Sequence, residues 1–434
     1  MAAVFAERRH KLLDAMGPDA VAILLGQTLV SRSNDTDYPF RQDSDFWYLT
    51  GFDHPGAIAV LRTDADPTYT LYVEPRDPAA ETWTGYRPGI EGAVADYAAD
   101  EAYERSKFLG DLPHLIEKAR HVHHVLGRDS RVDECITQTI EELRRRSRQG
   151  VSPPEAIIDP RGIVHEMRLI KEPAEIDIMR RAAAISAEAH KAAARLAHPG
   201  AYEYELQAVI EYTFRRRGTR GAAYSTIVGG GSNGTILHYV TNQAKLSDRE
   251  LVLIDAGCEL EGYASDVTRT YPIGGRFAGP GRAIYEVVFE AQQAALDQCN
   301  PGSTIAKIHD AAVRRIVEGL LELKLLSGDV DTLIAEEKHR PFYMHGTSHW
   351  LGLDVHDVGS YRTDGDPRPL EPGMCLTVEP GIYIAESNDA ADLRYRGIGV
   401  RIEDDVVITP DGHENLTEAI PRAPDELEAL VSDR

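Results

Sequence analysis

The first part of the chain combines short β-forming runs with a helical stretch. The strand-like runs, each bounded by Gly, Pro or Asp, are residues 21–25, 57–61 and 69–73. Residues 133–148 instead repeat apolar side chains at helical spacing, with Ile136, Ile140 and Leu143 among charged residues. These two patterns together predict an α/β domain.

A proline-rich break without periodicity follows at residues 150–154. We place the domain boundary between this break and Pro173. The chain is therefore predicted to consist of an N-terminal domain, residues 1–172, and a C-terminal domain, residues 173–434.

The second part of the chain begins with helices and continues with strands. Residues 174–197 have helical spacing. Glu175 and Asp177 lie in the first turn, where carboxylates interact favourably with the positive end of the helix dipole. The other predicted elements are helices at residues 204–217, 282–299 and 305–325, strands at residues 224–228, 235–240, 251–255 and 264–271, and alternating strands and turns from Cys375 onward. This order predicts an α+β domain in which helices pack on a mainly antiparallel sheet.

The composition narrows the class of protein. The chain has 434 residues, of which 42% are hydrophobic, enough to form two cores. We expect no membrane span, because no run of ~18 apolar residues occurs, and no secretory signal, because residues 1–10 become charged at once. The balance of 47 Lys and Arg against 70 Asp and Glu gives a net charge of -23, which argues against a nucleic-acid partner.

The four cysteines are far apart in the sequence and form no C-x-x-C pair; they are Cys135, Cys258, Cys299 and Cys375. Four cysteines in a chain of this length do not indicate a disulfide framework, so we expect each to be a small apolar side chain. Sparse, unpaired cysteines without an export signal indicate the cytoplasm.

A glycine-rich segment, residues 229–234, matches two well-known motifs. It fits the dinucleotide pattern G-x-G-x-x-G and, from Gly230 to Gly234, the serine-nucleophile pattern G-x-S-x-G. Both chemistries need a helix directly after the glycines, whereas β-forming residues follow here. We therefore interpret the segment as a glycine hairpin turn. The sequence also has no phosphate-loop motif and no H-E-x-x-H motif.

Two aspartates of the second domain are candidate site residues. Asp255 ends an apolar run, where a carboxylate is costly unless it is paired or binds a metal, and Asp266 follows eleven residues later. Gly257 and Gly262 between them allow a hairpin-like return that brings both carboxylates to one face. The alternative is that each aspartate caps an element or pairs with an arginine.

Three histidines occur within twelve residues, at His345, His349 and His356, among glycines and apolar side chains. A single histidine is usually a core or surface residue. Because the whole chain has only 16 histidines, this density favours a site.

Two further segments contribute carboxylates. Glu379 ends a strand-like run before a Pro-Gly turn. If residues 399–408 form a strand, the period of two places Arg401, Glu403 and Asp405 on one face. That face could be a solvated charged edge, but the flanking Val, Ile and Gly residues favour burial.

These segments together supply five candidate metal ligands: Asp255, Asp266, His349, Glu379 and Glu403. Hard oxygen ligands without a thiolate suit manganese, magnesium or a similar divalent ion. Four carboxylates also balance the charge of two divalent cations. The set therefore predicts a hydrolytic site in which two ions share a bridging hydroxide.

At these residues the sequence resembles the pita-bread metallopeptidases, and among them the bacterial aminopeptidase P group. Residues 38–48 and 81–83 resemble the N-terminal domain of that group, residues 164–168 its domain junction, and residues 344–359 its histidine block. Methionine aminopeptidases share the catalytic fold but usually lack the large N-terminal domain. Creatinase has both domains but lacks the metal ligands, all five of which are present here.

The resemblance implies a creatinase-like α/β N-terminal domain and a catalytic C-terminal domain of the pita-bread fold. It further implies a hydrolase with two divalent ions, expected to be Mn²⁺, that removes the N-terminal residue from peptides whose second residue is proline. Asp255 would bind one ion, and Asp266 and Glu403 would bridge both. His349 and Glu379 would complete the second ion's shell.

The resemblance also implies roles in turnover. The bridging hydroxide would attack the scissile carbonyl while a metal polarises it, and Glu379 would accept the proton of the nucleophile. His238 and His356 would steady the tetrahedral intermediate and the bound peptide. His345 would lie on the substrate side, and Arg401 would orient the ligands.

Two rival functions remain open at this point. Prolidase has the same ligands but cleaves only Xaa-Pro dipeptides; the match around Trp47 and Trp83 favours the aminopeptidase. A non-catalytic peptide-binding module of the same fold would generally have lost metal ligands. The resemblance also implies a homotetramer or homodimer in which Trp83 lies near a neighbour's site.

Overall fold

The computed structural model describes residues 2–63 and 65–433; Met1, Asp64 and Arg434, which the predicted domains include, lie outside the described residues. The chain divides into two compact units, Met1–Met167 and Arg168–Arg434. The boundary predicted from the sequence, after residue 172, falls slightly later. Arg168 and Lys171 bind Asp357, so these charged side chains associate with the second unit.

The first unit is built on one mixed sheet of order β6-β5-β4-β1-β7-β8. β1 pairs with β4 antiparallel and with β7 parallel. The strands of the sheet are β1 (Ala20–Leu25), β4 (Ile58–Arg62), β5 (Tyr69–Val73), β6 (Glu101–Glu104), β7 (His121–His124) and β8 (Ala156–Ile158), and β2 (Ser31–Ser33) and β3 (Thr36–Asp37) form a separate hairpin. The three predicted strands are confirmed, and the unit has the expected α/β class.

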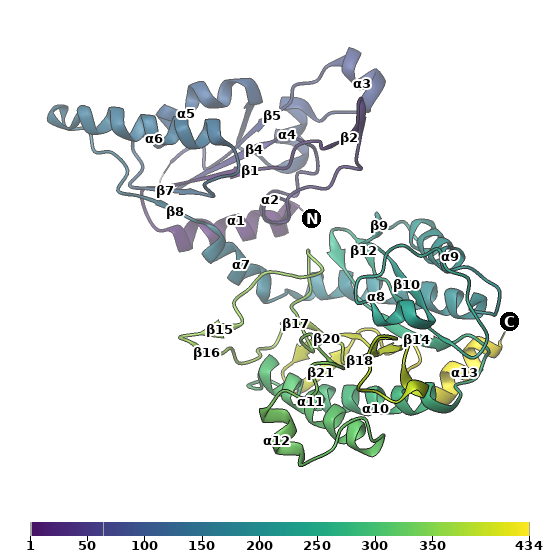
Figure 1. The fold of residues 1–434 in the computed structure, drawn as a ribbon. Coiled ribbons are helices and arrows are strands. Elements are labelled where there is room, and N and C mark those ends of the chain that lie inside the picture. Colours follow the sequence, from purple (N-terminus) through teal and green to yellow (C-terminus); the bar gives the residue numbers. More distant parts are fainter. Residues whose placement is uncertain (1, 64, 434) are drawn as a thin grey trace. The chain divides into compact units, whose positions relative to one another are not determined.

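Helices pack on this sheet because their apolar side chains face it. Phe108, Leu112 and Ile116 of α5 and Val132 and Ile136 of α6 form one core with the strands. Figure 1 shows α5 and α6 lying along the sheet. The helices are α1 (Ala2–Met16), α2 (Ser44–Thr50), α3 (Pro78–Thr84), α4 (Gly89–Tyr97), α5 (Phe108–Ile116), α6 (Ser130–Arg145) and α7 (Arg161–Leu169), with short 3-10 turns at Arg105–Lys107 and Ser147–Gln149. Residues 133–148 are thus helical for most of their length, as predicted.

The second unit begins with two helices whose starts follow from the sequence. Pro173 occupies the first turn of α8. The Glu175 carboxylate accepts a hydrogen bond from the backbone N–H of Glu172 at 2.9 Å, and this N–H has no hydrogen-bond partner within the helix. The helices are α8 (Pro173–Leu196), α9 (Glu203–Arg216), α10 (Gly279–Leu296), α11 (Ile305–Glu322), α12 (Val330–Ala335) and α13 (Pro424–Ser432). The four long helices are those predicted.

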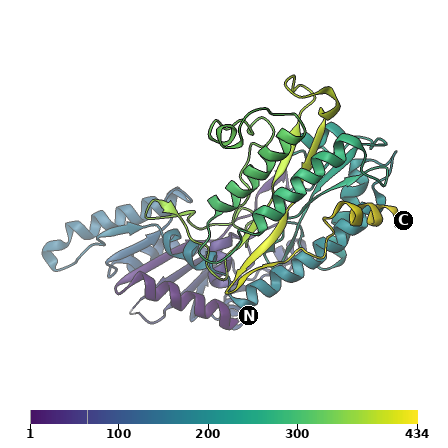
Figure 2. The ribbon, with the colours of Figure 1, turned by 90° about the horizontal axis from the view of Figure 1, so that it is seen from below.

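Short antiparallel sheets make up the rest of this unit, and several of their strands lie between α8 and the pair α10–α11 (Figure 1). Helix α8 packs beside α9, and α10 packs beside α11 (Figure 2). The sheets have the orders β10-β11-β14, β13-β12-β9, β17-β20-β21, β18-β19 and β15-β16. Their strands are β9 (Gly221–Ala222), β10 (Ile227–Gly230), β11 (Leu251–Asp255), β12 (Cys258–Leu260), β13 (Tyr263–Ala264), β14 (Thr268–Pro272), β15 (Arg362–Thr363), β16 (Asp366–Pro367), β17 (Cys375–Val378), β18 (Gly381–Ile384), β19 (Ile398–Arg401), β20 (Asp404–Thr409) and β21 (Gly412–Asn415), and 3-10 turns lie at Gly231–Thr235 and Leu393–Tyr395. The α+β architecture expected from the sequence is confirmed.

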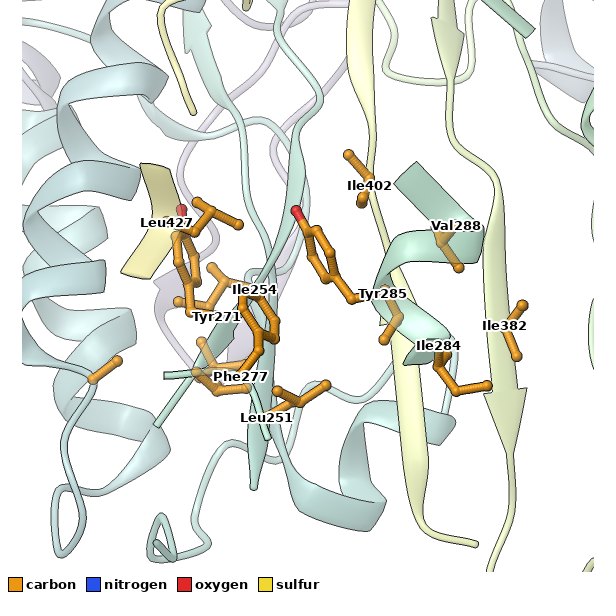
Figure 3. Packing of buried hydrophobic residues seen from close by; sticks show 14 of the residues in the cluster. Leu251, Ile254, Tyr271, Phe277, Ile284, Tyr285, Val288, Ile382, Ile402 and Leu427 are labelled. Atoms are coloured by element: carbon orange, nitrogen blue, oxygen red, sulfur yellow. The ribbon is translucent and has the colours of Figure 1, made fainter. Parts of the chain in front are cut away.

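Apolar side chains join these layers into a core. Figure 3 shows Ile254 and Tyr271 of the strands close to Phe277, with Tyr285 of α10 reaching toward Ile402. Each of these side chains is nearly or fully buried. Strands β11 and β14, which carry Ile254 and Tyr271, therefore pack against a well-filled core.

The predicted strand at residues 235–240 is wrong. These residues follow the 3-10 turn η3 (Gly231–Thr235) and form no strand. A strand needs a free edge, but β11 already pairs on both sides, and the Asn242 side chain accepts the N–H of Val228 at 3.0 Å. The interpretation of the glycine segment as a hairpin turn is wrong for the same reason.

Three other predicted strands are shifted or interrupted. The strand expected at residues 224–228 is found as β10, Ile227–Gly230, and the one expected at residues 264–271 splits into β13 and β14 around Asp266. The single strand expected at residues 399–408 is also interrupted, between Arg401 and Asp404. The two interruptions contain Asp266 and Glu403, which the sequence proposed as metal ligands.

No helix in the described part of the chain is long and apolar enough to cross a membrane.

Candidate metal centre

A cavity of about 450 Å³ lies in the second unit. Its walls bring together all nine residues that the sequence proposed for metal binding or catalysis, along with Leu237, Gly346, Ser348 and Tyr361. The nine are His238, Asp255, Asp266, His345, His349, His356, Glu379, Arg401 and Glu403. Segments far apart in the sequence therefore meet at one site.

The first pair of carboxylates comes from neighbouring strands. Asp255 is the last residue of β11 and lies opposite Thr268 of β14, and Asp266 lies just before that strand. A Cβ at Gly257 would lie 1.7 Å from the backbone oxygen of Ser265. Only a glycine allows the two segments to approach so closely, so the predicted return between the aspartates is present.

His349 lies between two of the carboxylates. Its Nε2 is 3.4 Å from Asp266 Oδ2 and 3.5 Å from Glu379 Oε1, while its Nδ1 is 2.9 Å from the backbone oxygen of Trp350. Since a carbonyl accepts a hydrogen bond, Nδ1 carries the proton and Nε2 faces the carboxylates. Burial alone would lower the pKa of His349, but Asp266 and Glu379 raise it to about 9.

Glu403 is held by the strand beside it. Its backbone N–H donates to the oxygen of Thr268 at 3.0 Å, and the Thr268 hydroxyl donates to Glu403 Oε2 at 2.6 Å. Asp405, which was expected on the same face, instead accepts the backbone N–H of Asp266 at 3.1 Å. Glu403 and Asp405 are at most 2% exposed, so burial of this segment is confirmed over a solvated edge.

Arg401 connects the ligand candidates to a tyrosine and a histidine. Its guanidinium donates to Asp255 Oδ2 at 2.6 Å and to the Tyr383 hydroxyl at 2.9 Å. The Tyr383 hydroxyl is in turn 2.8 Å from His345 Nε2. Burial, assisted by Arg401, lowers the pKa of His345 to about 3, so this imidazole is neutral and Tyr383 donates to it.

The remaining histidines line the open side of the cavity. His238 is exposed, in the segment that follows η3. The ring of His356 contacts that of His349 edge-on, with centroids 4.4 Å apart. Burial and the neighbouring His349 lower the pKa of His356.

The carboxylates are crowded in a way that favours cations. Burial raises the pKa of Glu379 to about 7 and that of Glu403 well above its usual value, and the neighbouring carboxylates add to both effects. Burial also raises the pKa of Asp255, although Arg401 opposes this. One arginine cannot neutralise four buried carboxylates, whereas divalent cations would relieve their repulsion.

Three of the candidates already have the spacing of a metal site. Ligand atoms of Asp266, His349 and Glu403 all lie within 4.8 Å of one another. Oxygen-rich donor sets of this kind suit hard divalent ions. The residues therefore fit a divalent metal centre.

The sequence did not single out three residues of this site. Tyr224 donates to Asp255 Oδ1 at 2.6 Å, and Thr268 and Tyr383 support Glu403 and His345 as described above. Thr268 could have been found, because it lies two residues after Asp266 in the segment leading into a strand. Tyr224 and Tyr383 carry no comparable signal, since buried tyrosines are common in cores.

The family of the chain is shown by comparison with known proteins. Residues 177–410 match metallopeptidase family M24, and residues 5–124 match the aminopeptidase P N-terminal domain. The chain belongs to metallopeptidase family M24 and has the pita-bread fold. The resemblance stated from the sequence is confirmed.

Relatives are similar over almost their whole length. The chain is 47% identical to the Xaa-Pro aminopeptidase of Escherichia coli over 430 residues, which cover 98% of this chain and 97% of the relative. It is also similar to the structure of Pseudomonas aeruginosa aminopeptidase PepP, with 46% identity, a TM-score of 0.96 and coverage of 100% and 98% of the two chains. A structure of Escherichia coli aminopeptidase P with the inhibitor Pro-Leu gives a TM-score of 0.95 at 46% identity, again covering 100% and 98%.

Proposed function

We propose that the protein is a metal-dependent Xaa-Pro aminopeptidase, which releases the N-terminal residue from peptides with proline in the second position. The observation that supports this most strongly is the complete set of five ligand candidates around one cavity in a chain 47% identical to an Xaa-Pro aminopeptidase. The intact ligand set argues against a non-catalytic peptide-binding module.

We assign the ligands as Asp255, Asp266, His349, Glu379 and Glu403. Together these residues would hold two divalent ions, for which manganese is our proposal. Divalent ions at this site would polarise the scissile carbonyl and lower the pKa of a bound water.

Proton transfer would then fall to a side chain of the protein. Glu379, which lines the cavity beside His349, would take a proton from a water nucleophile and return it later in the reaction. The nitrogen that leaves belongs to a proline imide without an N–H, so it must gain a proton as the bond breaks. Glu379 is our candidate for that transfer.

The histidines and Arg401 would hold the substrate and the ligands. His238 and His356 line the cavity and would donate to the peptide and to the developing tetrahedral oxygen. His345 would contact the substrate side as a neutral imidazole. Arg401 would fix Asp255, whose Oδ2 it binds at 2.6 Å.

We further propose a cytoplasmic location and assembly as a homotetramer or homodimer. The four cysteines are all free thiols in the described structure, which supports a reducing compartment. Trp83 is 88% exposed, and an exposed indole of this kind is often found at protein interfaces.

The first experiment compares two substrates with manganese added: an Xaa-Pro dipeptide and an Xaa-Pro-Yaa-Yaa tetrapeptide. Release of Xaa from the tetrapeptide, abolished by a chelator, would support the aminopeptidase. An Xaa-Ala-Yaa-Yaa peptide serves as the matched control for proline.

The other outcomes are equally informative. Cleavage of the dipeptide alone would make the protein a prolidase. Metal binding without cleavage of either peptide would favour the binding module and contradict the proposal.

A further inference from the structure

The loop that carries His356 is closed on itself. The N–H of Asp357 donates to the backbone oxygen of Trp350 at 2.9 Å, and the N–H of Ala264 donates to the oxygen of Gly352 at 2.8 Å. His349 and His356 therefore flank the two ends of one fixed loop. Asp357, at the end of this loop, directly follows His356 in the sequence.

Asp357 is held by two buried cations. Lys171 Nζ is 2.9 Å from its Oδ2, and Arg168 Nη2 is 2.6 Å from its Oδ1. The Lys171 and Asp357 side chains are 1% exposed and that of Arg168 is 3% exposed. Arg168 also binds Asp354 at 2.8 Å, so it contacts the loop at two points.

The packing around this ion cluster leaves no free space. A Cβ at Gly352 would lie 2.2 Å from Asp357 Oδ2 and 2.9 Å from Lys171 Cε. The loop backbone thus lies directly on the ion pair, which is possible only because residue 352 is a glycine.

We propose that Arg168 and Lys171 are positioning residues for the reaction: by fixing Asp357, they hold His356 beside His349 at the cavity wall. Neither cation lines the cavity itself, so both act through Asp357. This inference rests on the proposed function, because it gives His356 a role toward the substrate.

The test uses the full-length, manganese-loaded enzyme with the Lys171→Met substitution. We expect kcat to fall by roughly 10- to 100-fold, the usual effect of misplacing a catalytic group, while KM and metal content stay near those of the wild type. Arg180→Met, which removes an exposed ion pair with Glu414 in the same unit, is the matched control and should leave kcat unchanged.

A double-mutant cycle separates positioning from general damage. In a His356→Ala background, Lys171→Met should lower kcat no further, because the group that Lys171 positions is already gone. An equal loss in both backgrounds would overturn the proposal. If Lys171→Met does not fold, Asp357→Asn keeps the side-chain shape and enters the same cycle with the same expectation.

A spectroscopic measurement keeps this inference separate from the proposed function. With ¹⁵N-labelled histidine in the metal-free protein, Lys171→Met should shift the ring resonances of His356, identified by their loss in His356→Ala. An unshifted resonance would overturn the inference even if the enzyme is active. A wild type that cleaves no Xaa-Pro peptide would contradict the proposed function, while the shift would still report on the ion cluster.

Discussion

Asp255 carries two kinds of interaction at once. The sequence left open whether it pairs with an arginine or belongs to a site, and the structure shows both: it binds Arg401 and Tyr224 and also lines the cavity. Because burial raises its pKa, protons compete with cations for its oxygens. Metal affinity at this site should therefore fall as the pH falls.

The first prediction concerns Asp266. Asp266→Asn should lower peptidase activity by more than about 100-fold, beyond the effect typical of groups outside the metal's immediate shell. Bound metal, measured by elemental analysis of the dialysed protein, should fall with it. Asp310→Asn, at an exposed position on α11, is the control; survival of both activity and metal content in Asp266→Asn would refute the assignment.

A second prediction uses a buried histidine behind the site. His190 is fully buried, its Nε2 lies 2.9 Å from the oxygen of Ala256, and burial lowers its pKa to about 4. The stability that its neutral form supports is complete above the unfolded pKa of about 6.5 and is lost as the pH falls toward 4. Titration of His190 alone should therefore cost the wild type about 3 kcal/mol over this window.

His190→Gln should remove this pH dependence, because the amide does not titrate and can still donate to Ala256. Urea unfolding of the metal-free protein between pH 7 and pH 4 measures the effect. His198→Gln, at an exposed position, should retain the slope. Parallel curves for wild type and His190→Gln would show that the histidine does not titrate in this window.

At the level of elements, the return from β11 to β14 brings the two aspartates together. Gly257→Ala would place a Cβ 1.7 Å from the backbone oxygen of Ser265, and backbone atoms cannot rotate away as a side chain can. We expect a loss of about 3 kcal/mol in unfolding free energy, together with weaker metal binding.

Gly281→Ala in α10 is a matched control, since its Cβ would meet only side-chain atoms of Leu251 at 3.4 Å or more. It should be neutral or slightly stabilising, because alanine favours a helix. Unfolding monitored by circular dichroism compares the two variants. Equal stability of Gly257→Ala and wild type would mean that the hairpin adapts.

The elements also show what can be predicted from sequence. The alanine-rich periodicity of residues 174–197 defined α8 because helical spacing is a local property. The strand predicted from the β-forming residues 235–240 is absent, because β-propensity does not tell whether a neighbouring strand has a free edge. The side chain of Asn242 hydrogen-bonds to the edge of β10 instead. Asp255 and Asp266 could be found from the apolar runs around them, whereas Tyr224 became visible only when folding placed its hydroxyl 2.6 Å from Asp255.

At the scale of the whole molecule, the site lies entirely within the second unit, residues 168–434. Metal binding should therefore stabilise that unit by linkage. With free metal at 100 times its dissociation constant, each bound ion raises the free energy of unfolding by about 2.7 kcal/mol. This corresponds to a rise of about 5–10 °C in Tm for a domain of this size. Calorimetry with and without a chelator measures the shift; an unchanged Tm would contradict metal binding.

The carboxylate ligand candidates lie where strands of three sheets end. Asp255 ends β11, Glu379 follows β17, and Glu403 lies between β19 and β20. In the unfolded chain these carboxylates are far apart along the sequence, and closing the loops between them costs conformational entropy. We therefore expect the chain to fold before the ion binds, so that metal loading is the last step in the maturation of the protein.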